Sequence, residues 1–302
     1  MTASYLSLSE TEFKYKIKLL LNRLNHCDLC PRNCKINRNQ KLGFCKSGRL
    51  AGVASATLHF GEEPPISGNK GSGAVFFHHC TLQCLYCQNY PISQMHDFPL
   101  QSKEKLAKTF LHLQKQGSHN INLVTPTHFV PQILEALYIA REEGLNIPLV
   151  YNSSGYESSD VIELLKNIID IYVLDMKYSD NTLAKSLSHV NNYVEENQKT
   201  IMAAFKQTGF LKTNKEGIGE KGLIIRHLVL PGYIKNSKNI LDYIGTNISP
   251  NITLSLMSQY FPAYRARTHK SLHRKLTPEE YEIIVQYAIK LNFNNAFIQN
   301  LS

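Results

Sequence analysis

The chain has 302 residues, of which 43% are hydrophobic and 19% are charged, a balance that is ordinary for a folded globular protein. It contains no run of about 18 apolar residues and no recognisable secretory signal, so we expect a cytoplasmic protein without a membrane span. The net charge of +9 is spread along the chain, which is typical of a solvated surface and keeps an acidic protein or RNA as a candidate partner.

The first predicted element is an amphipathic helix over residues 10–25. Its apolar residues, which include Phe13, Ile17 and Leu20, recur at helical spacing. Ser9 and Glu12 are placed to form a capping box at its start. We expect the apolar stripe of this helix to pack on the core of the protein.

Four closely spaced cysteines follow this helix. Seven cysteines without a secretory signal favour reduced thiols, and their clustering favours metal ligands over disulfides. The spacing C-x2-C-x3-C-x10-C supplies four thiolates, which satisfy a tetrahedral zinc ion or hold a [4Fe–4S] cluster with no open iron. The spacing does not distinguish zinc from a second cluster. The four ligands are Cys27, Cys30, Cys34 and Cys45.

The segment around these cysteines is short and rich in Lys, Arg and Asn. Because it has little apolar core, bound metal would supply much of its folding energy. Arg32 and Arg38 are expected to face water rather than the thiolates.

A strand-like segment over residues 50–60 leads into a loop rich in Gly and Pro, which indicates a domain boundary near residue 72. We therefore expect residues 1–72 to hold the helix, the metal module and a linker, and residues 73–302 to form the main domain. Glu62 and Glu63 lie in this loop. They could reach a catalytic pocket, but solvent exposure is the default expectation for loop carboxylates.

The second group of cysteines lies within GAVFFHHCTLQCLYCQNY, residues 73–90. Its C-x3-C-x2-C spacing offers three thiolates to an iron–sulfur cluster that usually takes four, so one iron would stay open for chemistry. The alternatives are buried thiols of the core, or a zinc site completed by His78 or His79. The three cysteines are Cys80, Cys84 and Cys87.

From residue 74 onward, strand-like and helix-like segments alternate. Apolar strands without strict alternation, separated by helices, indicate a parallel sheet that is covered on both faces. An α/β fold of the partial (β/α)6 barrel type fits this order. The expected strands cover residues 74–77, 121–125, 148–152, 171–175, 223–230 and 252–257, and the expected helices cover residues 102–116, 131–143, 159–168, 182–207 and 236–246.

The last predicted helix has a well-marked start. Thr277 is its N-cap, Pro278 is its first residue, and Glu280 completes a capping box. Its buried face is expected to consist of Ile283, Ile284, Tyr287 and Leu291.

The three-cysteine loop, with the aromatic Tyr86 before its last cysteine, resembles the radical S-adenosylmethionine (SAM) superfamily. That resemblance implies an open iron that chelates SAM and cleaves it reductively to a 5′-deoxyadenosyl radical. Further stretches resemble the PflX-type members, which are often described as relatives of pyruvate formate-lyase activating enzyme. These stretches are LCPRNC with GFC, HFGEEPPISG, CQNYPIS, NLVTPTHFVP, YNSSGYE, DMKY, RHLVLPG and SLMSQYFPAY, and together they cover roughly residues 26–270.

The resemblance also implies SAM contacts at the carboxyl ends of the strands, where barrels of this kind collect their chemistry. The sequence has TPTH where the superfamily commonly has Gly-Gly-Glu, so the partner of the SAM amino group is open between threonines and His128. Asp-Met-Lys matches the stretch that glycyl-radical-enzyme activases carry at the fourth strand. An arginine inside the apolar fifth strand requires a carboxylate partner, either from SAM or from Asp175. The candidate cofactor-binding residues are Tyr86, Thr125, Thr127, Asn152, Asp175, Lys177 and Arg226.

These features predict a radical SAM enzyme that receives an electron from a flavodoxin- or ferredoxin-like donor. The expected reaction removes a hydrogen atom, with a glycine of a glycyl radical enzyme as the first candidate target. Another protein, RNA or a small metabolite is the alternative target. A hypothesis from another class is a non-catalytic interaction protein in which both cysteine groups bind zinc.

Overall fold

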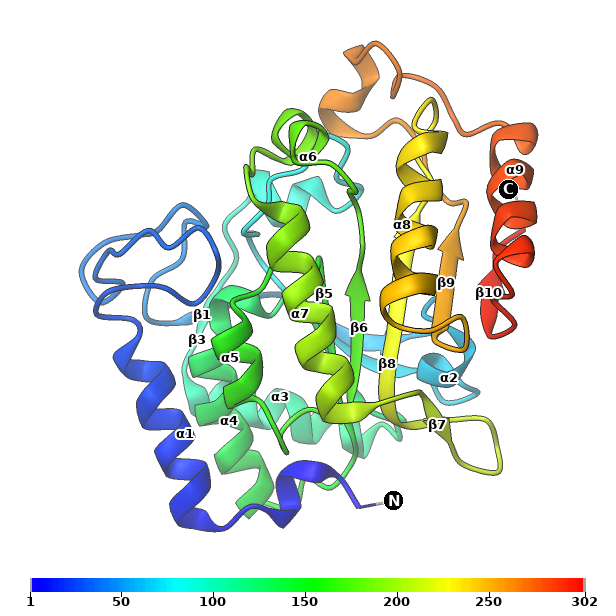
Figure 1. Cartoon of the computed structure of the whole chain (residues 1–302). Coiled ribbons are helices and arrows are strands. Elements are labelled where there is room, and N and C mark those ends of the chain that lie inside the picture. The colour runs from blue at the N-terminus through cyan, green and yellow to red at the C-terminus, as the bar shows by residue number, and fades with distance from the viewer. Residues whose placement is uncertain (1, 301–302) are drawn as a thin grey trace.

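The protein is built around one twisted sheet (Figure 1). The computed structural model describes residues 2–300, and within that range ten strands pair in the order β10-β9-β8-β6-β5-β4-β2-β1-β3, with β7 beside β8. Neighbouring strands from β2 to β10 run parallel, whereas β1, β3 and β7 pair antiparallel with their neighbours. The strands are β1 Ala51–His59, β2 Ser72–Phe77, β3 Leu100–Gln101, β4 Ile121–Val124, β5 Leu149–Ser153, β6 Ile171–Asp175, β7 Lys212–Thr213, β8 Gly219–Leu228, β9 Thr253–Met257 and β10 Ala296–Ile298.

Helices connect the parallel strands and cover the outer face of the sheet. Figure 1 shows α7 and α8 lying along β6 and β8 on this face. None of the helices within residues 2–300 has both the length and the apolarity needed to cross a membrane. The helices are α1 Glu10–Asn22, α2 Pro64–Ser67, α3 Lys103–Lys115, α4 Val130–Glu142, α5 Ser159–Leu164, α6 Asn181–Ser188, α7 Tyr193–Thr208, α8 Ile234–Asn247 and α9 Pro278–Lys290.

The predicted fold class is confirmed, because all six expected strands form and pair in parallel in the expected chain order. Burial explains why they do so. Every residue of β5 and of β9 is buried, as expected for strands covered on both faces. A seventh parallel strand, β10, follows the last helix and was not predicted, because its three residues give too short a pattern to recognise.

The N-terminal region shares the sheet and the core of the barrel. β1 pairs antiparallel with β2, and the predicted strand over residues 50–60 is thereby confirmed. Leu24, Cys27 and Leu29 belong to the same apolar core as the parallel strands. α1 packs on α4, where the rings of Phe13 and Tyr138 lie 5.6 Å apart.

Three predicted helix details differ in the structure. The expected helix over residues 182–207 is interrupted at His189, whose backbone is left-handed (φ 55°), and so it forms two helices, α6 and α7. The expected helix over residues 159–168 ends at Leu164. At the start of α1 the Ser9 hydroxyl accepts a hydrogen bond from the Glu12 N–H, but the described contacts include no return bond from Glu12.

The start of α9 agrees with the sequence, because Thr277 and Glu280 form the predicted capping box. Its buried face was only partly predicted. Ile284 is fully buried, but Ile283 is 45% exposed, since adjacent residues point about 100° apart around a helix. The prediction for Ile283 is therefore wrong. The buried residues of α9 are Tyr281, Ile284, Val285 and Ala288, with Tyr287 and Leu291 partly buried against the core.

Candidate active site

A cavity of ≈ 900 Å³ lies at the carboxyl ends of the parallel strands. This is the end at which parallel α/β folds place their binding sites. The three cysteines of the second group line the cavity on one side. Consecutive parallel strands from β4 to β9 contribute Thr125, Asn152, Asp175, Arg226 and Met257 at or near their ends.

The loop after β2 presents the three cysteines to this cavity. Each sulfur has a polar neighbour: the Leu82 N–H donates to Cys80 Sγ at 3.4 Å, and the Ser188 hydroxyl donates to Cys84 Sγ at 2.9 Å. The Ser93 hydroxyl lies 3.2 Å from Cys87 Sγ. Hydrogen bonds to the sulfurs are what iron-bound thiolates use to tune a cluster.

The three sulfurs therefore fit the donor set of an iron–sulfur cluster with one open iron. Burial raises the pKa of Cys80 to about 12 and that of Cys87 to about 11. Both thiols are neutral at pH 7 without metal, so iron must displace their protons when it binds.

The alternative of a zinc site completed by a histidine finds no support in the geometry. His78 Nδ1 accepts a hydrogen bond from the Phe98 N–H at 3.1 Å, and His79 Nε2 lies 3.1 Å from Asp97 Oδ1. Neither histidine lines the cavity with the cysteines. The two rings instead stack on each other, with centroids 4.0 Å apart.

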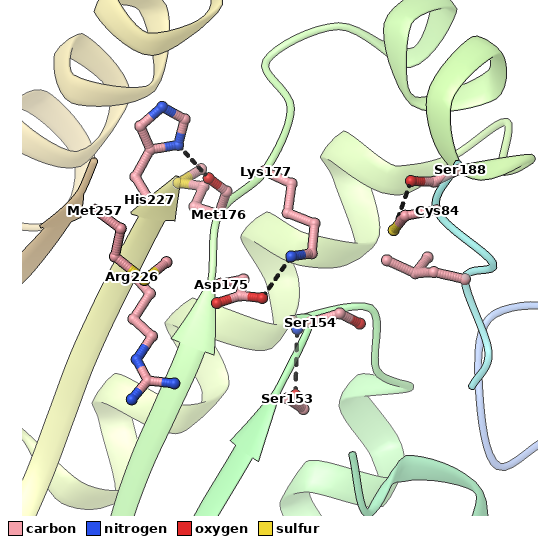
Figure 2. Close-up of polar contacts among 12 residues, drawn as sticks. Cys84, Ser153, Ser154, Asp175, Met176, Lys177, Ser188, Arg226, His227 and Met257 are labelled. Carbon is pink, nitrogen blue, oxygen red and sulfur yellow. Dashed lines mark hydrogen bonds and ion pairs between the residues drawn. The ribbon is translucent and has the colours of Figure 1, made fainter. Parts of the chain in front are cut away.

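Asp175 and Lys177 form a buried ion pair beside the cysteine loop, shown in Figure 2. Lys177 Nζ lies 2.6 Å from Asp175 Oδ2, and the two side chains are only 17% and 20% exposed, so this is not a surface pair. Burial alone would favour the neutral amine, but the negative charges of Asp175 and Cys84 outweigh it and raise the pKa of Lys177. A permanently charged ammonium group therefore faces the cavity.

Arg226 is held by two carboxylates that the sequence analysis expected to be exposed. Its Nε donates to Glu63 Oε1 at 2.6 Å, and its Nη2 contacts both Glu62 and Glu63. Its Nη1 donates to Asn152 Oδ1 at 3.2 Å. Arg226 thus pairs with Glu62 and Glu63 rather than with Asp175, and the default exposure of the two glutamates is corrected. The contact of Arg226 with SAM stays a prediction. A buried guanidinium needs carboxylate partners, and the loop before α2 supplies them.

The charges of Arg226, Glu62 and Glu63 stabilise one another because the three side chains lie close together. Burial favours the neutral form of Arg226, but Glu63 and Glu62 outweigh it and raise its pKa. Burial also opposes the charge of Glu63, yet Arg226 and Ser255 hold its pKa below the ordinary value. Sequence reasoning identified the need for an acidic partner but not the partner itself, because 163 residues separate Glu63 from Arg226.

The two threonines of the TPTH stretch lie in different places. Thr125 lines the cavity, and its backbone is left-handed (φ 60°), a conformation that costs a β-branched residue roughly 1–3 kcal/mol. Such strain is common at ligand sites. Thr127 is outside the lining, since it is 1% exposed and its hydroxyl donates to the buried carboxyl of Glu157 at 2.7 Å. Its side chain therefore does not face the cavity, and a contact between Thr127 and SAM stays a prediction without geometric support. His128 is also buried, with Nε2 2.7 Å from the His78 carbonyl oxygen.

Tyr86 lines the cavity but is 4% exposed, so most of its ring is covered. Its hydroxyl shares a hydrogen bond of 2.7 Å with the hydroxyl of Tyr178, which in turn lies 2.5 Å from Ser188 Oγ. Because Ser188 also donates to Cys84, this chain of hydroxyls fixes the cysteine loop against α6. Sequence reasoning missed Ser188, which carries no recognisable motif.

The protein is similar in sequence and in fold to several known proteins. The protein is 32% identical over 291 residues to the uncharacterized protein MJ0674 of Methanocaldococcus jannaschii, covering 92% of this chain and 79% of that protein. Its fold matches native anSMEcpe with bound AdoMet and Kp18Cys peptide (TM-score 0.51, 12% identity, 75% of this chain and 57% of that chain). A weaker match is Streptococcus suis SuiB bound to precursor peptide SuiA (TM-score 0.48, 17% identity, 72% of this chain and 46% of that chain).

The chain spans about half the length of these two solved proteins, and at such low identity the likeness to anSMEcpe concerns the fold alone. The family model is more specific, because it matches residues 74–244, which hold the cysteine loop and the strand ends from β4 to β8. This match covers more than half of the chain. The protein therefore belongs to the Radical SAM superfamily, whose members are enzymes that use a [4Fe–4S] cluster and SAM.

Proposed function

We propose that this enzyme uses SAM to remove a hydrogen atom from a backbone glycine of a partner protein, as activases of glycyl radical enzymes do. The observation that carries the proposal is the buried Asp175–Lys177 pair at the end of β6, beside the cysteine loop. The activases that this sequence resembles carry the same Asp-x-Lys stretch at this strand, where it helps to hold SAM and the incoming peptide.

The reaction balances with one external electron. Cys80, Cys84 and Cys87 would hold the [4Fe–4S] cluster, which would supply the electron for the reductive cleavage of SAM to methionine and a 5′-deoxyadenosyl radical. The glycine Cα would give up one hydrogen atom, so that 5′-deoxyadenosine forms and the unpaired electron stays on the glycine. A flavodoxin- or ferredoxin-like protein is the proposed source of the electron.

The charges that line the cavity suit SAM. Glu62, Glu63 and Asp175 bring three negative charges, and Lys177 and Arg226 bring two positive ones, which leaves one net negative charge inside a protein of net charge +9. SAM carries a sulfonium, an ammonium and a carboxylate group, so its net charge is opposite to that of the cavity. In the proposal Lys177 attracts the SAM carboxylate.

The size of the cavity supports a second molecule beside SAM. Its volume of ≈ 900 Å³ is near the upper end of the roughly 300–1,000 Å³ that small-molecule sites occupy. The structure of anSMEcpe, which has a similar fold, holds AdoMet and a peptide together. A peptide is therefore the substrate class that we propose for the remaining space.

The test follows the hydrogen atom. Cells that naturally make this protein are grown on α-deuterated glycine, and their extract is separated into protein, RNA and small-molecule fractions. Each fraction is incubated with SAM and the reconstituted, dithionite-reduced enzyme. We expect deuterium in the 5′-deoxyadenosine from the protein fraction only, as detected by mass spectrometry.

A parallel extract from cells grown on α-deuterated alanine is the matched control, and its protein fraction should transfer no label. Label arriving from the RNA or small-molecule fraction would replace the proposed substrate class. Deuterium-free 5′-deoxyadenosine from a protein fraction that nevertheless stimulates SAM cleavage would contradict glycine as the target.

A further inference from the structure

The four N-terminal cysteines lie in one short folded segment. Cys34 Sγ lies 3.9 Å from the Cys27 carbonyl oxygen, which also accepts a hydrogen bond from the Lys35 N–H at 3.0 Å. Gly43 lies between two of the sulfurs, because a methyl group on it would be 3.6 Å from the sulfurs of both Cys34 and Cys45. Together with the C-x2-C-x3-C-x10-C spacing, these contacts make the four thiols candidate ligands of one metal centre.

The spacing of the sulfurs distinguishes the metals. Zinc binds thiolate sulfur at about 2.3 Å in a tetrahedron, which places the sulfurs about 3.8 Å from one another. Among residues 2–300, no three cysteine sulfurs lie within 4.8 Å of one another. In a [4Fe–4S] cluster each thiolate binds a different iron, so its sulfurs lie farther apart than around a single ion. The sulfurs of Cys80, Cys84 and Cys87 are likewise not all within 4.8 Å of one another.

Two buried arginines supply the positive charge that such a centre needs. Arg38 is 2% exposed, and among the described contacts its guanidinium donates only to carbonyl oxygens, including those of Ser47 at 3.1 Å and Gly48 at 2.7 Å. Two of these carbonyl groups, those of Ser47 and Gly48, follow Cys45 closely in the chain, so the guanidinium lies beside the cysteine segment. The expectation that Arg38 faces water is therefore wrong, and a buried cation without a carboxylate fits a neighbouring centre whose metal-bound thiolates carry negative charge.

Arg32 connects this centre to the catalytic loop. Its Nη2 donates to the carbonyl oxygens of Leu82 at 3.1 Å and His189 at 3.0 Å, and its Nε donates to that of Thr81. The expectation that Arg32 faces water is thus also wrong. Its guanidinium also lies over the ring of Phe44, one residue before Cys45 in the N-terminal segment, with 3.5 Å between its central carbon and the ring centroid. The two cysteine groups are neighbours in space, with Arg32 between them.

We infer that Cys27, Cys30, Cys34 and Cys45 hold a second [4Fe–4S] cluster rather than zinc, and that this cluster fixes Arg32 against the catalytic cysteine loop. All four irons of this cluster have a thiolate ligand, so it offers no open position to SAM. The inference does not depend on which substrate the enzyme attacks.

The deciding protein is the full chain with Cys80, Cys84 and Cys87 all replaced by alanine. It is purified anaerobically and reconstituted with iron and sulfide, and its fold is checked by circular dichroism. We expect about four iron and about four sulfide per chain, no stoichiometric zinc, and a Mössbauer spectrum of a [4Fe–4S] cluster. The companion variant replaces Cys27, Cys30, Cys34 and Cys45 by alanine and leaves the catalytic loop unchanged.

One zinc per folded triple variant, no metal, or iron without sulfide would each overturn the inference. These results leave the proposed function untouched, because the cluster at Cys80, Cys84 and Cys87 is measured in other proteins, namely the companion variant and the wild type. If the companion variant does not fold, the difference in iron between the wild type and the triple variant gives the same information.

Discussion

The two cysteine groups of this protein share their ligand chemistry but differ in what surrounds them. In neither group do three sulfurs lie within 4.8 Å of one another, and in each group burial raises the pKa of two thiols. The catalytic group has three cysteines and faces a cavity of ≈ 900 Å³. The N-terminal group has four, and none of them lines that cavity.

This difference favours chemistry at one group and, under the inference above, support at the other. An open coordination position is useful only where a ligand can reach it, and the cavity brings the charged residues Asp175, Lys177 and Arg226 to the same place. The inferred, fully ligated centre at the N-terminal cysteines would stabilise its own segment instead. Arg32 joins the two groups, so each prediction below breaks or sharpens the division between them.

The largest effect is expected from Cys84→Ala. Removal of one of three cluster ligands should abolish SAM cleavage while the fold stays intact, because the loop keeps its other contacts. The measurement is 5′-deoxyadenosine formation by the reconstituted, dithionite-reduced protein. Ser188→Ala is the matched control, since it removes the hydrogen bond to Cys84 Sγ but no ligand, and it should retain measurable cleavage. Retained cleavage in Cys84→Ala would contradict the cluster assignment.

Arg226→Ala should have the next largest effect, on stability. It leaves Glu62 and Glu63 buried together without their cation, which should cost about 3–5 kcal/mol of unfolding free energy in denaturant titration. Arg274→Ala breaks a more exposed pair with Glu280 and should cost less than about 1 kcal/mol. Equal losses of unfolding free energy in the two variants would contradict a stabilising role of Arg226 with Glu62 and Glu63.

Arg32→Ala should uncouple the two cysteine groups. Hydrogen bonds from a charged donor contribute about 1.5–3 kcal/mol, so their loss should speed amide hydrogen exchange in residues 80–88 by roughly tenfold or more. Arg49→Ala, which breaks a pair with Glu135 instead, should leave the exchange of this loop unchanged. An unchanged rate in Arg32→Ala would mean that the N-terminal centre gives the loop no support.

The sequence predicted the strands and the cysteine loop at the cavity, but not most of the polar contacts between distant segments. Apolar runs and cysteine spacing are local patterns, so all six expected strands and the candidate ligands could be read from them, and the metal at Cys27, Cys30, Cys34 and Cys45 stays a prediction. The partners of Arg226, Arg38 and Arg32 lie far away in sequence, and no periodicity indicates which distant residues will meet. Thr127 lies next to the end of a predicted strand, yet its side chain is buried in the core instead of facing the cavity.

The smallest predicted effect concerns Glu157, a fully buried carboxyl group near Cys30 that accepts hydrogen bonds from Thr127 and Tyr151. Burial raises its pKa above the ordinary value of 4.5, so the folded state binds this proton more tightly than the unfolded state does. Its contribution to stability is therefore present below pH 4.5 and is lost as the pH rises through the raised pKa.

Glu157→Gln mimics the protonated group. At pH 8 the variant should therefore be more stable than the wild type, by on the order of 1 kcal/mol. At pH 4 the two proteins should be nearly equal in stability. Denaturant titrations at the two pH values measure this. A variant that loses more stability at pH 8 than at pH 4 would mean that the carboxylate is charged in the folded protein and takes part in the charge balance of the N-terminal centre.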